Sequence, residues 1–284
     1  MVNLGRFAGL TGEDRSGVQP VSDVRTHPRA EMSQPEPSRP AVLLLAAPPV
    51  GASAWTEVQR RLTHHGLANT APDLFDPEHA SVIHSQGLDA LVDALAPNAN
   101  NACVVAHGQA VPIALHLAQK VPVHALVLSN GPIQALDPFA TAVSRIARFA
   151  GPALRTWSRP ALANTSLASS ACLRRLVVNP YVMDRETVTQ MTASWTADRL
   201  RRRAMVRWMR ELPDLIAAAP PPSVPTLLVW GDEDVLYPSF LADQATGLGS
   251  DIIQVRVPGG RHLHIVERPW ELADQVHDYL RRQS

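Results

Sequence analysis

The stretch Asn101–Gln119, NACVVAHGQAVPIALHLAQ, most constrains the fold of this 284-residue chain. It opens with the apolar run Cys103–Ala106, which is typical of a buried strand in a parallel sheet. The tight turn His107–Gln109 follows, and a helix is predicted after it because small and aliphatic residues recur on one face. Pro112 is compatible with this helix, since a first-turn N–H has no helical partner. The stretch therefore predicts a βα unit of a parallel sheet.

Apolar runs bounded by turn residues predict further strands, and apolar residues at helical spacing predict helices between and after them. The predicted strands cover residues 41–46, 68–74, 103–106, 123–129, 226–230 and 252–257, and the helices around them include residues 54–65, 83–95 and 269–282. Strands that alternate with helices are the pattern of a doubly wound, mostly parallel sheet. The predicted fold class is therefore α/β.

The segment from residue 138 to 215 differs, because its pattern predicts helices alone, broken by prolines. We interpret it as a helical cap inserted over the carboxyl edge of the sheet. The α/β core is then formed by residues 41–137 and 216–284. Residues 1–40 are polar and rich in proline. They bury too little apolar surface to offset the entropy of ordering, so we predict a disordered tail.

Composition restricts the expected location of the protein and the kinds of partner that it can bind. The formal net charge is zero, so neither nucleic acid nor an anionic membrane is expected as a partner. No apolar run approaches the roughly 20 residues that span a bilayer, and the N-terminus lacks the pattern of a signal peptide. Cys103 and Cys172 lie far apart, so a reducing, cytoplasmic location is expected. No metal-ligand spacing is apparent, and no cofactor is implied.

Three further motifs accompany the βα unit. Residues 71–74 read Ala-Pro-Asp-Leu, residues 224–234 read VPTLLVWGDED, and residues 257–262 read VPGGRH. Residues 41–284 resemble the α/β-hydrolase superfamily, in particular its compact esterase and hydroxynitrile-lyase branch. The resemblance rests on these three motifs, on the βα unit around Gly108, and on Trp55, which follows the first predicted strand in the sequence. The resemblance implies an α/β-hydrolase fold whose pocket lies between the core and the cap.

The last two motifs contain an acid and a histidine where the family has its catalytic acid and base. The resemblance assigns the role of the catalytic acid to Asp234 and that of the base to His262. Their order after the βα unit agrees with the order in the family. A carboxylate that accepts from one imidazole nitrogen fixes the tautomer, and it stabilises the charge formed when the other nitrogen takes a proton. We therefore expect Asp234 and His262 to form a dyad.

The nucleophile of the family is absent. In the family's nucleophile elbow, G-x-S-x-G, Ala106 and Ala110 replace the two glycines and Gly108 replaces the serine. Glycine has no side chain, so no acyl-enzyme can form at this position. Removing a triad nucleophile costs on the order of a millionfold in turnover, roughly 8 kcal/mol of barrier.

A second departure concerns the oxyanion site. Counting back from Trp55 places Pro48 at the position whose backbone N–H the family uses, and a shift of one residue gives Pro49. Proline has no N–H, so Gln109 remains the expected donor. Losing one such donor costs about 3–4 kcal/mol in acyl transfer. Both departures argue against serine-esterase chemistry.

Other side chains could supply a nucleophile. Ser129 ends the strand that follows the elbow helix, next to Asn130, and both are expected near the pocket. Ser53 lies in the loop over the site. No neighbour in the sequence marks any of these groups as activated. His107 is expected to be structural, and His264 to pack or to line the pocket rim.

The predicted cap is rich in arginine, with thirteen Arg against five Asp and Glu in residues 138–215. On one interpretation these arginines form a solvated helix face whose stems cover apolar surface. On the other, Trp195, Arg199, Arg203 and Trp208 face the substrate. They would then form an electropositive lid for an anionic substrate or a carrier-bound acyl group.

Three functions remain open. The chain could be an enzyme that uses His262 and Asp234 for general-base catalysis on a small carbonyl-containing substrate, by hydrolysis through an activated water or by elimination, isomerisation or cyclisation. It could be an inactive pseudo-hydrolase that serves as a binding or scaffold protein. It could also be an esterase with a displaced nucleophile such as Ser129. We favour the first, because the proton-relaying pair is present and the acylation machinery is not.

Overall fold

A computed structural model describes residues 39–133, 138–169 and 172–283. The predicted disordered tail therefore lies outside the described residues, except for its last two. Within the described ranges, six strands form one sheet in the order β2-β1-β3-β4-β5-β6, and every neighbouring pair is parallel. The predicted α/β class and parallel sheet are thus confirmed. The strands are β1 Val42–Ala46, β2 Asn69–Thr70, β3 Cys103–His107, β4 Ala125–Ser129, β5 Thr226–Gly231 and β6 Ile252–Val257.

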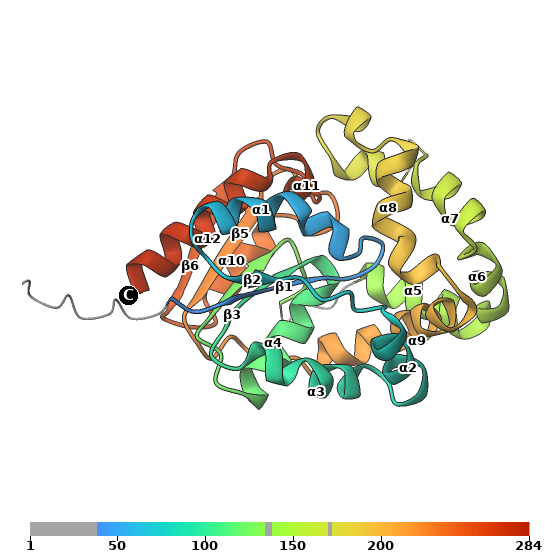
Figure 1. The fold of residues 1–284 in the computed structure, drawn as a ribbon, viewed down its shortest axis with the longest axis horizontal. Coiled ribbons are helices and arrows are strands. Elements are labelled where there is room, and N and C mark those ends of the chain that lie inside the picture. Colours follow the sequence, from blue (N-terminus) through green and yellow to red (C-terminus); the bar gives the residue numbers. More distant parts are fainter. Residues whose placement is uncertain (1–38, 134–137, 170–171, 284) are drawn as a thin grey trace, which may run out of the picture. The chain divides into compact units, whose positions relative to one another are not determined.

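The central strands are buried along their whole lengths, as their mainly apolar sequences predict. Helices cover both faces of the sheet: Figure 1 shows α1 and α12 on one face and α3 and α4 on the other. The bounds of the helices that pack on the sheet or follow its strands are α1 Thr56–His64, α2 Pro77–Ser85, α3 Leu88–Ala99, α4 Val111–Lys120, α10 Phe240–Thr246, α11 His264–Glu267 and α12 Pro269–Gln283.

Between β4 and β5 the described chain forms helices only. These are α5 Pro138–Phe149, α6 Gly151–Trp157, α7 Pro160–Leu167, α8 Arg185–Thr196 and α9 Arg199–Ala217. The long helix α9 packs against α5, α6 and α8 of this group and also against α2, α3 and α4, which lie beside the sheet. Figure 1 shows α5–α9 gathered on one side of the sheet. Four short 3-10 helices complete the described elements: η1 Ala52–Trp55, η2 Gly108–Ala110, η3 Leu173–Leu176 and η4 Pro180–Val182.

Two predicted elements are wrong in extent. The strand expected over residues 68–74 is the two-residue edge strand β2, because Pro72 lacks the N–H that would continue the ladder. The single helix expected over residues 83–95 is two helices, α2 and α3, separated at Gly87. Gly87 has a φ of +103°, a backbone conformation that a continuous helix excludes.

Candidate active site

The carboxyl ends of the strands carry the residues predicted to form the site. Because the strands are parallel and in register, Ala46 at the end of β1, His107 at the end of β3 and Ser129 at the end of β4 are direct neighbours. The chain leaves the sheet at this edge after each strand. The predicted site residues that follow are Pro48 and Pro49 after β1, Gly108 and Gln109 after β3, Asn130 after β4, Asp234 after β5 and His262 after β6.

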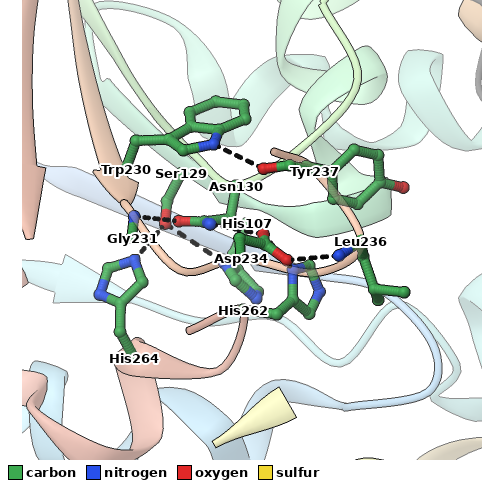
Figure 2. Close-up of polar contacts among 10 residues, drawn as sticks. All are labelled: His107, Ser129, Asn130, Trp230, Gly231, Asp234, Leu236, Tyr237, His262 and His264. Carbon is green, nitrogen blue, oxygen red and sulfur yellow. Dashed lines mark hydrogen bonds and ion pairs between the residues drawn. The ribbon is translucent and has the colours of Figure 1, made fainter. Parts of the chain in front are cut away.

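The structure brings His262 and Asp234 together. The Nδ1 atom of His262 lies 2.9 Å from Oδ2 of Asp234, and both residues are 5% exposed. An ionised carboxylate has no proton to donate, so Nδ1 of His262 carries the hydrogen of this bond, and Nε2 is the ring nitrogen on the other side. Figure 2 shows Asp234 between His262 and Asn130.

Asp234 is held as an anion by the donors around it. The side-chain amide of Asn130 donates to Oδ2 over 2.5 Å, and the backbone N–H of Leu236 donates to Oδ1 over 2.7 Å. Burial acts to raise the pKa of this carboxyl, but the adjacent His262 and the N–H donors outweigh it, and the pKa lies below its ordinary value. Asn130 is itself fixed, since its Oδ1 accepts the N–H of Gly231 over 3.0 Å.

The free nitrogen of His262 faces the turn after β3. A Cβ placed on Gly108 would lie 3.5 Å from Nε2 and 3.6 Å from Cε1 of His262. Gly108 has a φ of +58°, in the left-handed region that favours glycine. The backbone thus makes the sharp strand-to-helix turn of a nucleophile elbow. The imidazole is directed at the place that a side chain at position 108 would occupy.

The loop after β1 lies over the same space. Pro48 and Pro49 line the cavity, and the peptide bond between them is cis. Neither proline has an N–H to offer. The carbonyl of Pro49 accepts the indole N–H of Trp195 over 3.0 Å, which ties this loop to α8. Gln109 also lines the cavity. Its backbone N–H lies at the start of η2, where N–H groups lack a partner within the helix.

A cavity of about 630 Å³ opens above the dyad. Its floor is formed by His107, Gly108 and His262, and its walls are mainly apolar. The inserted helices supply much of the wall, and two of their indole rings, those of Trp157 and Trp195, stack with centroids 6.0 Å apart. Its size is in the range of pockets that bind a small molecule.

Ser129 and Asn130 lie beneath this cavity rather than in its lining. Ser129 is completely buried, and its Oγ is 2.9 Å from Nε2 of His264 and 3.3 Å from Nδ1 of His107 (Figure 2). Burial lowers the pKa of His264 to about 3 and the pKa of His107 well below its ordinary value. Both rings are therefore neutral at pH 7, and Ser129 joins them in an internal hydrogen-bonded chain.

The residues predicted on the substrate side of the cap are only partly at the cavity. Trp195 lines it, but Trp208, Arg199 and Arg203 are not among the described residues that do. Trp208 is fully buried and packs against Phe75, with ring centroids 5.6 Å apart. For these three residues, a position facing the substrate stays a prediction.

Several neighbouring arginines of α9 form hydrogen bonds within the protein. Arg207 bonds Glu211 and the carbonyl of His84, and Arg210 donates to the carbonyl of Ala147. Contacts of this kind hold α9 against the elements beside it.

Two of the polar groups at the cavity, Tyr237 and Arg175, could not be predicted from the sequence. Tyr237 lies three residues after the acid and lines the cavity, and its ring centroid is 5.6 Å from that of His262. Arg175, on η3, is a second such residue. Their place in the lining depends on how η3 and the loop after β5 pack, which local sequence patterns do not encode.

In the described ranges, no group of three or more His, Cys, Asp or Glu side chains is arranged to hold a metal ion. None of the helices in these ranges combines the length and apolarity that crossing a bilayer requires.

The chain belongs to the alpha/beta hydrolase family, whose sequence profile matches residues 42–275. A comparison with curated proteins finds no significant match. Among solved structures, the haloalkane dehalogenase DbeA from Bradyrhizobium elkani is similar at 20% identity, with a TM-score of 0.65 over 86% of this chain and 91% of that one.

Two further structures show the same fold. One is an alpha/beta hydrolase fold protein from Burkholderia ambifaria, at 21% identity, with a TM-score of 0.63 over 85% of this chain and 91% of that one. The other is a thermophilic esterase from Thermogutta terrifontis, at 20% identity, with a TM-score of 0.61 over 86% of this chain and 90% of that one. At these identities the likeness is one of fold.

Proposed function

We propose that this protein is an enzyme that uses His262 as a general base, supported by Asp234, and that forms no covalent intermediate. The observation that carries the proposal is the direction of the imidazole. Nε2 of His262 faces the bare backbone of Gly108 at the floor of the cavity, while Nδ1 is bonded to a buried carboxylate. A small carbonyl-containing substrate in the cavity could place a proton, or a water molecule, beside that nitrogen.

The proton then moves to Nε2 of His262. In hydrolysis it comes from a water, whose oxygen attacks the carbonyl carbon; the bond from that carbon to the leaving group then breaks, and the leaving group takes the proton back from the imidazole. In elimination, isomerisation or cyclisation the proton comes from a carbon next to the carbonyl. In both cases the imidazolium that forms is stabilised by ionised Asp234. The amide of Gln109 is the donor available to the carbonyl oxygen as it becomes negative. The chemistry proposed needs no cofactor.

The inserted helices have a defined part in this proposal. We treat residues 138–215 as a cap over a core formed by residues 41–137 and 216–284. The cap would close the cavity over the substrate, and exclusion of water would strengthen each electrostatic interaction at the base. We propose a cytoplasmic location for this activity on the grounds of cysteine usage.

The geometry gives less support to the two alternatives. An esterase with Ser129 as a displaced nucleophile requires substrate access to a hydroxyl that is fully buried and outside the cavity lining. A binding or scaffold protein requires the cavity but has no use for the orientation of His262. This second alternative predicts that removing the imidazole leaves every activity of the protein unchanged.

The test is turnover in a mixture of small metabolites. Purified protein is incubated with a cell extract in H₂¹⁸O or in D₂O, and mass spectrometry follows which compounds disappear and which gain label. Hydrolysis would add one ¹⁸O to a product, and proton transfer at carbon would add deuterium. His262→Ala should lower the rate by about 10²–10⁴-fold, whereas His124→Ala, an exposed histidine remote from the cavity, should not.

Two results would count against the proposal. Equal conversion by wild-type protein and His262→Ala would exclude the imidazole as the base. Labelling of Ser129 by a fluorophosphonate probe, followed by loss of conversion, would favour the displaced-nucleophile alternative.

A further inference from the structure

The cavity combines an apolar lining with a single charged side chain. Among the described residues that line it, no Asp, Glu or Lys is present, and Arg175 is the one group that carries a permanent charge. A cationic ligand would find no counter-charge there, and burying an unpaired charge in apolar surroundings is costly. The lining therefore suits a ligand whose body is apolar and whose charge, if it has one, is negative.

The guanidinium of Arg175 is available to a ligand. Arg175 is exposed, and its side chain makes no hydrogen bond or ion pair within the described part of the structure. The preceding residue differs: Nε of Arg174 donates to the carbonyl of Met183 over 3.2 Å. Arginine presents its N–H groups as a planar fork that matches carboxylate and phosphate oxygens.

Arg175 is also held at a fixed place relative to the base. The turn η3, which carries it, is bonded to the loop of His262, because the N–H of Leu263 donates to the carbonyl of Leu176 over 2.8 Å. Just beyond, Nη1 of Arg261 donates to the carbonyl of Val177 over 3.0 Å. The cation and the base thus stand on joined segments that line one cavity.

We propose that the ligand of this cavity is an amphipathic anion, with an apolar acyl or aryl body and a carboxylate or phosphate group that Arg175 binds. The apolar body would lie against the walls that include Trp157 and Trp195, and the anionic group would lie toward the exposed guanidinium. The inference rests on the proposed function in one respect, that this ligand is the substrate on which His262 acts.

The test is equilibrium binding to the full-length protein at low ionic strength, by calorimetry. The probes share one apolar chain and differ in the head group: decanoate, decyl phosphate, decanol and decyltrimethylammonium. At least one anion should bind more tightly than decanol, and the cation should bind most weakly. Whichever of decanoate and decyl phosphate binds more tightly identifies the preferred head group.

Two arginine variants locate the preference. Arg175→Met keeps an apolar stem, and it should weaken binding of the favoured anion by about threefold to tenfold, a modest factor because the guanidinium is exposed to solvent. It should leave decanol unchanged. Arg174→Met removes the same charge from the same turn and should leave the preference intact. The preference should also shrink as salt is raised.

The proposal would be overturned if decanol bound as tightly as both anions, if neither anion bound at millimolar concentration, or if the two arginine variants lost the preference equally. These outcomes are separate from the fate of the proposed catalysis, because binding is measured without turnover. A protein that showed the anion preference but converted nothing would contradict the general-base proposal alone.

Discussion

Gly108→Ser is the sharpest test of how the elbow and the oxyanion loop limit the chemistry. The substitution returns a hydroxyl to the place that Nε2 of His262 faces. Its Cβ would sit 3.5 Å from that nitrogen and 4.0 Å from the carbonyl oxygen of Asn130, both ordinary contacts. One further bond brings the hydroxyl oxygen within hydrogen-bonding reach of the imidazole, at about 2.7–3.0 Å.

The structural cost of this change should be small. The φ of +58° at position 108 disfavours any residue with a Cβ, at roughly 1–2 kcal/mol. Part of this is offset because serine restricts the unfolded chain more than glycine does. A net loss of about 1 kcal/mol corresponds to a fall of roughly 2–4 °C in Tm. The variant should therefore fold, and its kinetics can be interpreted.

The kinetics should show a nucleophile without a complete oxyanion site. A fluorophosphonate probe should label Gly108→Ser but not the wild-type protein, and the double variant with His262→Ala should label far more slowly. Turnover of p-nitrophenyl acetate should remain slow. With Gln109 as one donor and prolines on the other side, the loss is about 10²–10³-fold relative to a two-donor site. A kcat/KM of about 10⁴ M⁻¹s⁻¹ or more would show that a second donor exists, which would refute our account of the Pro48–Pro49 loop.

Three further predictions concern stability. Asn130→Gly, which tolerates the φ of +44° at this position, should cost about 3 kcal/mol by leaving the N–H of Gly231 unpaired and removing a donor from the dyad carboxylate; thermal unfolding measures it. Since the buried His264 has its pKa lowered to about 3, the unfolded state takes up its proton first on acidification. For this group, the free energy of unfolding should fall by about 1–2 kcal/mol per pH unit between pH 6.5 and 3. When this free energy is measured by urea unfolding at several pH values, it should depend less steeply on pH in His264→Gln. Trp195→Phe removes the donor to Pro49 and should cost about 1 kcal/mol, with faster amide exchange just after the prolines.

The parts of the fold that the sequence predicted are those fixed by local pattern. β1, β3 and β4 are short apolar runs, apart from the terminal His107 and Ser129, and such runs are typical of a strand buried on both faces. β2 was overextended because the polar pair Asn69–Thr70 pairs only briefly at the sheet edge before Pro72 intervenes. The helix break at Gly87 was missed because its neighbours keep helical spacing on both sides, and the positive φ becomes visible only in three dimensions.

Some residues of the candidate site could likewise be predicted from local sequence, and others could not. Asp234 and His262 were found because each lies in a motif at a strand end, and parallel strands bring those ends together. Arg175 and Tyr237 could not be found, since a cavity wall is set by tertiary packing. The partners of the α9 arginines could not be predicted for the same reason: Arg207 and Arg210 donate to carbonyl groups of His84 and Ala147, which lie on other elements.

The two members of the dyad contribute differently to the protein. Asp234 is a buried anion that accepts from Asn130, Leu236 and His262, so it fixes the loop after β5 and its removal would leave several donors unpaired. His262 gives only Nδ1 to this network. Its Nε2 faces the floor of the cavity at Gly108, and within the described residues that nitrogen makes no hydrogen bond that would hold the fold. Proton transfer requires an imidazole that is hydrogen-bonded at one nitrogen and free at the nitrogen on the cavity side. This separation of structural and chemical roles favours a catalytic base over an inactive remnant of one.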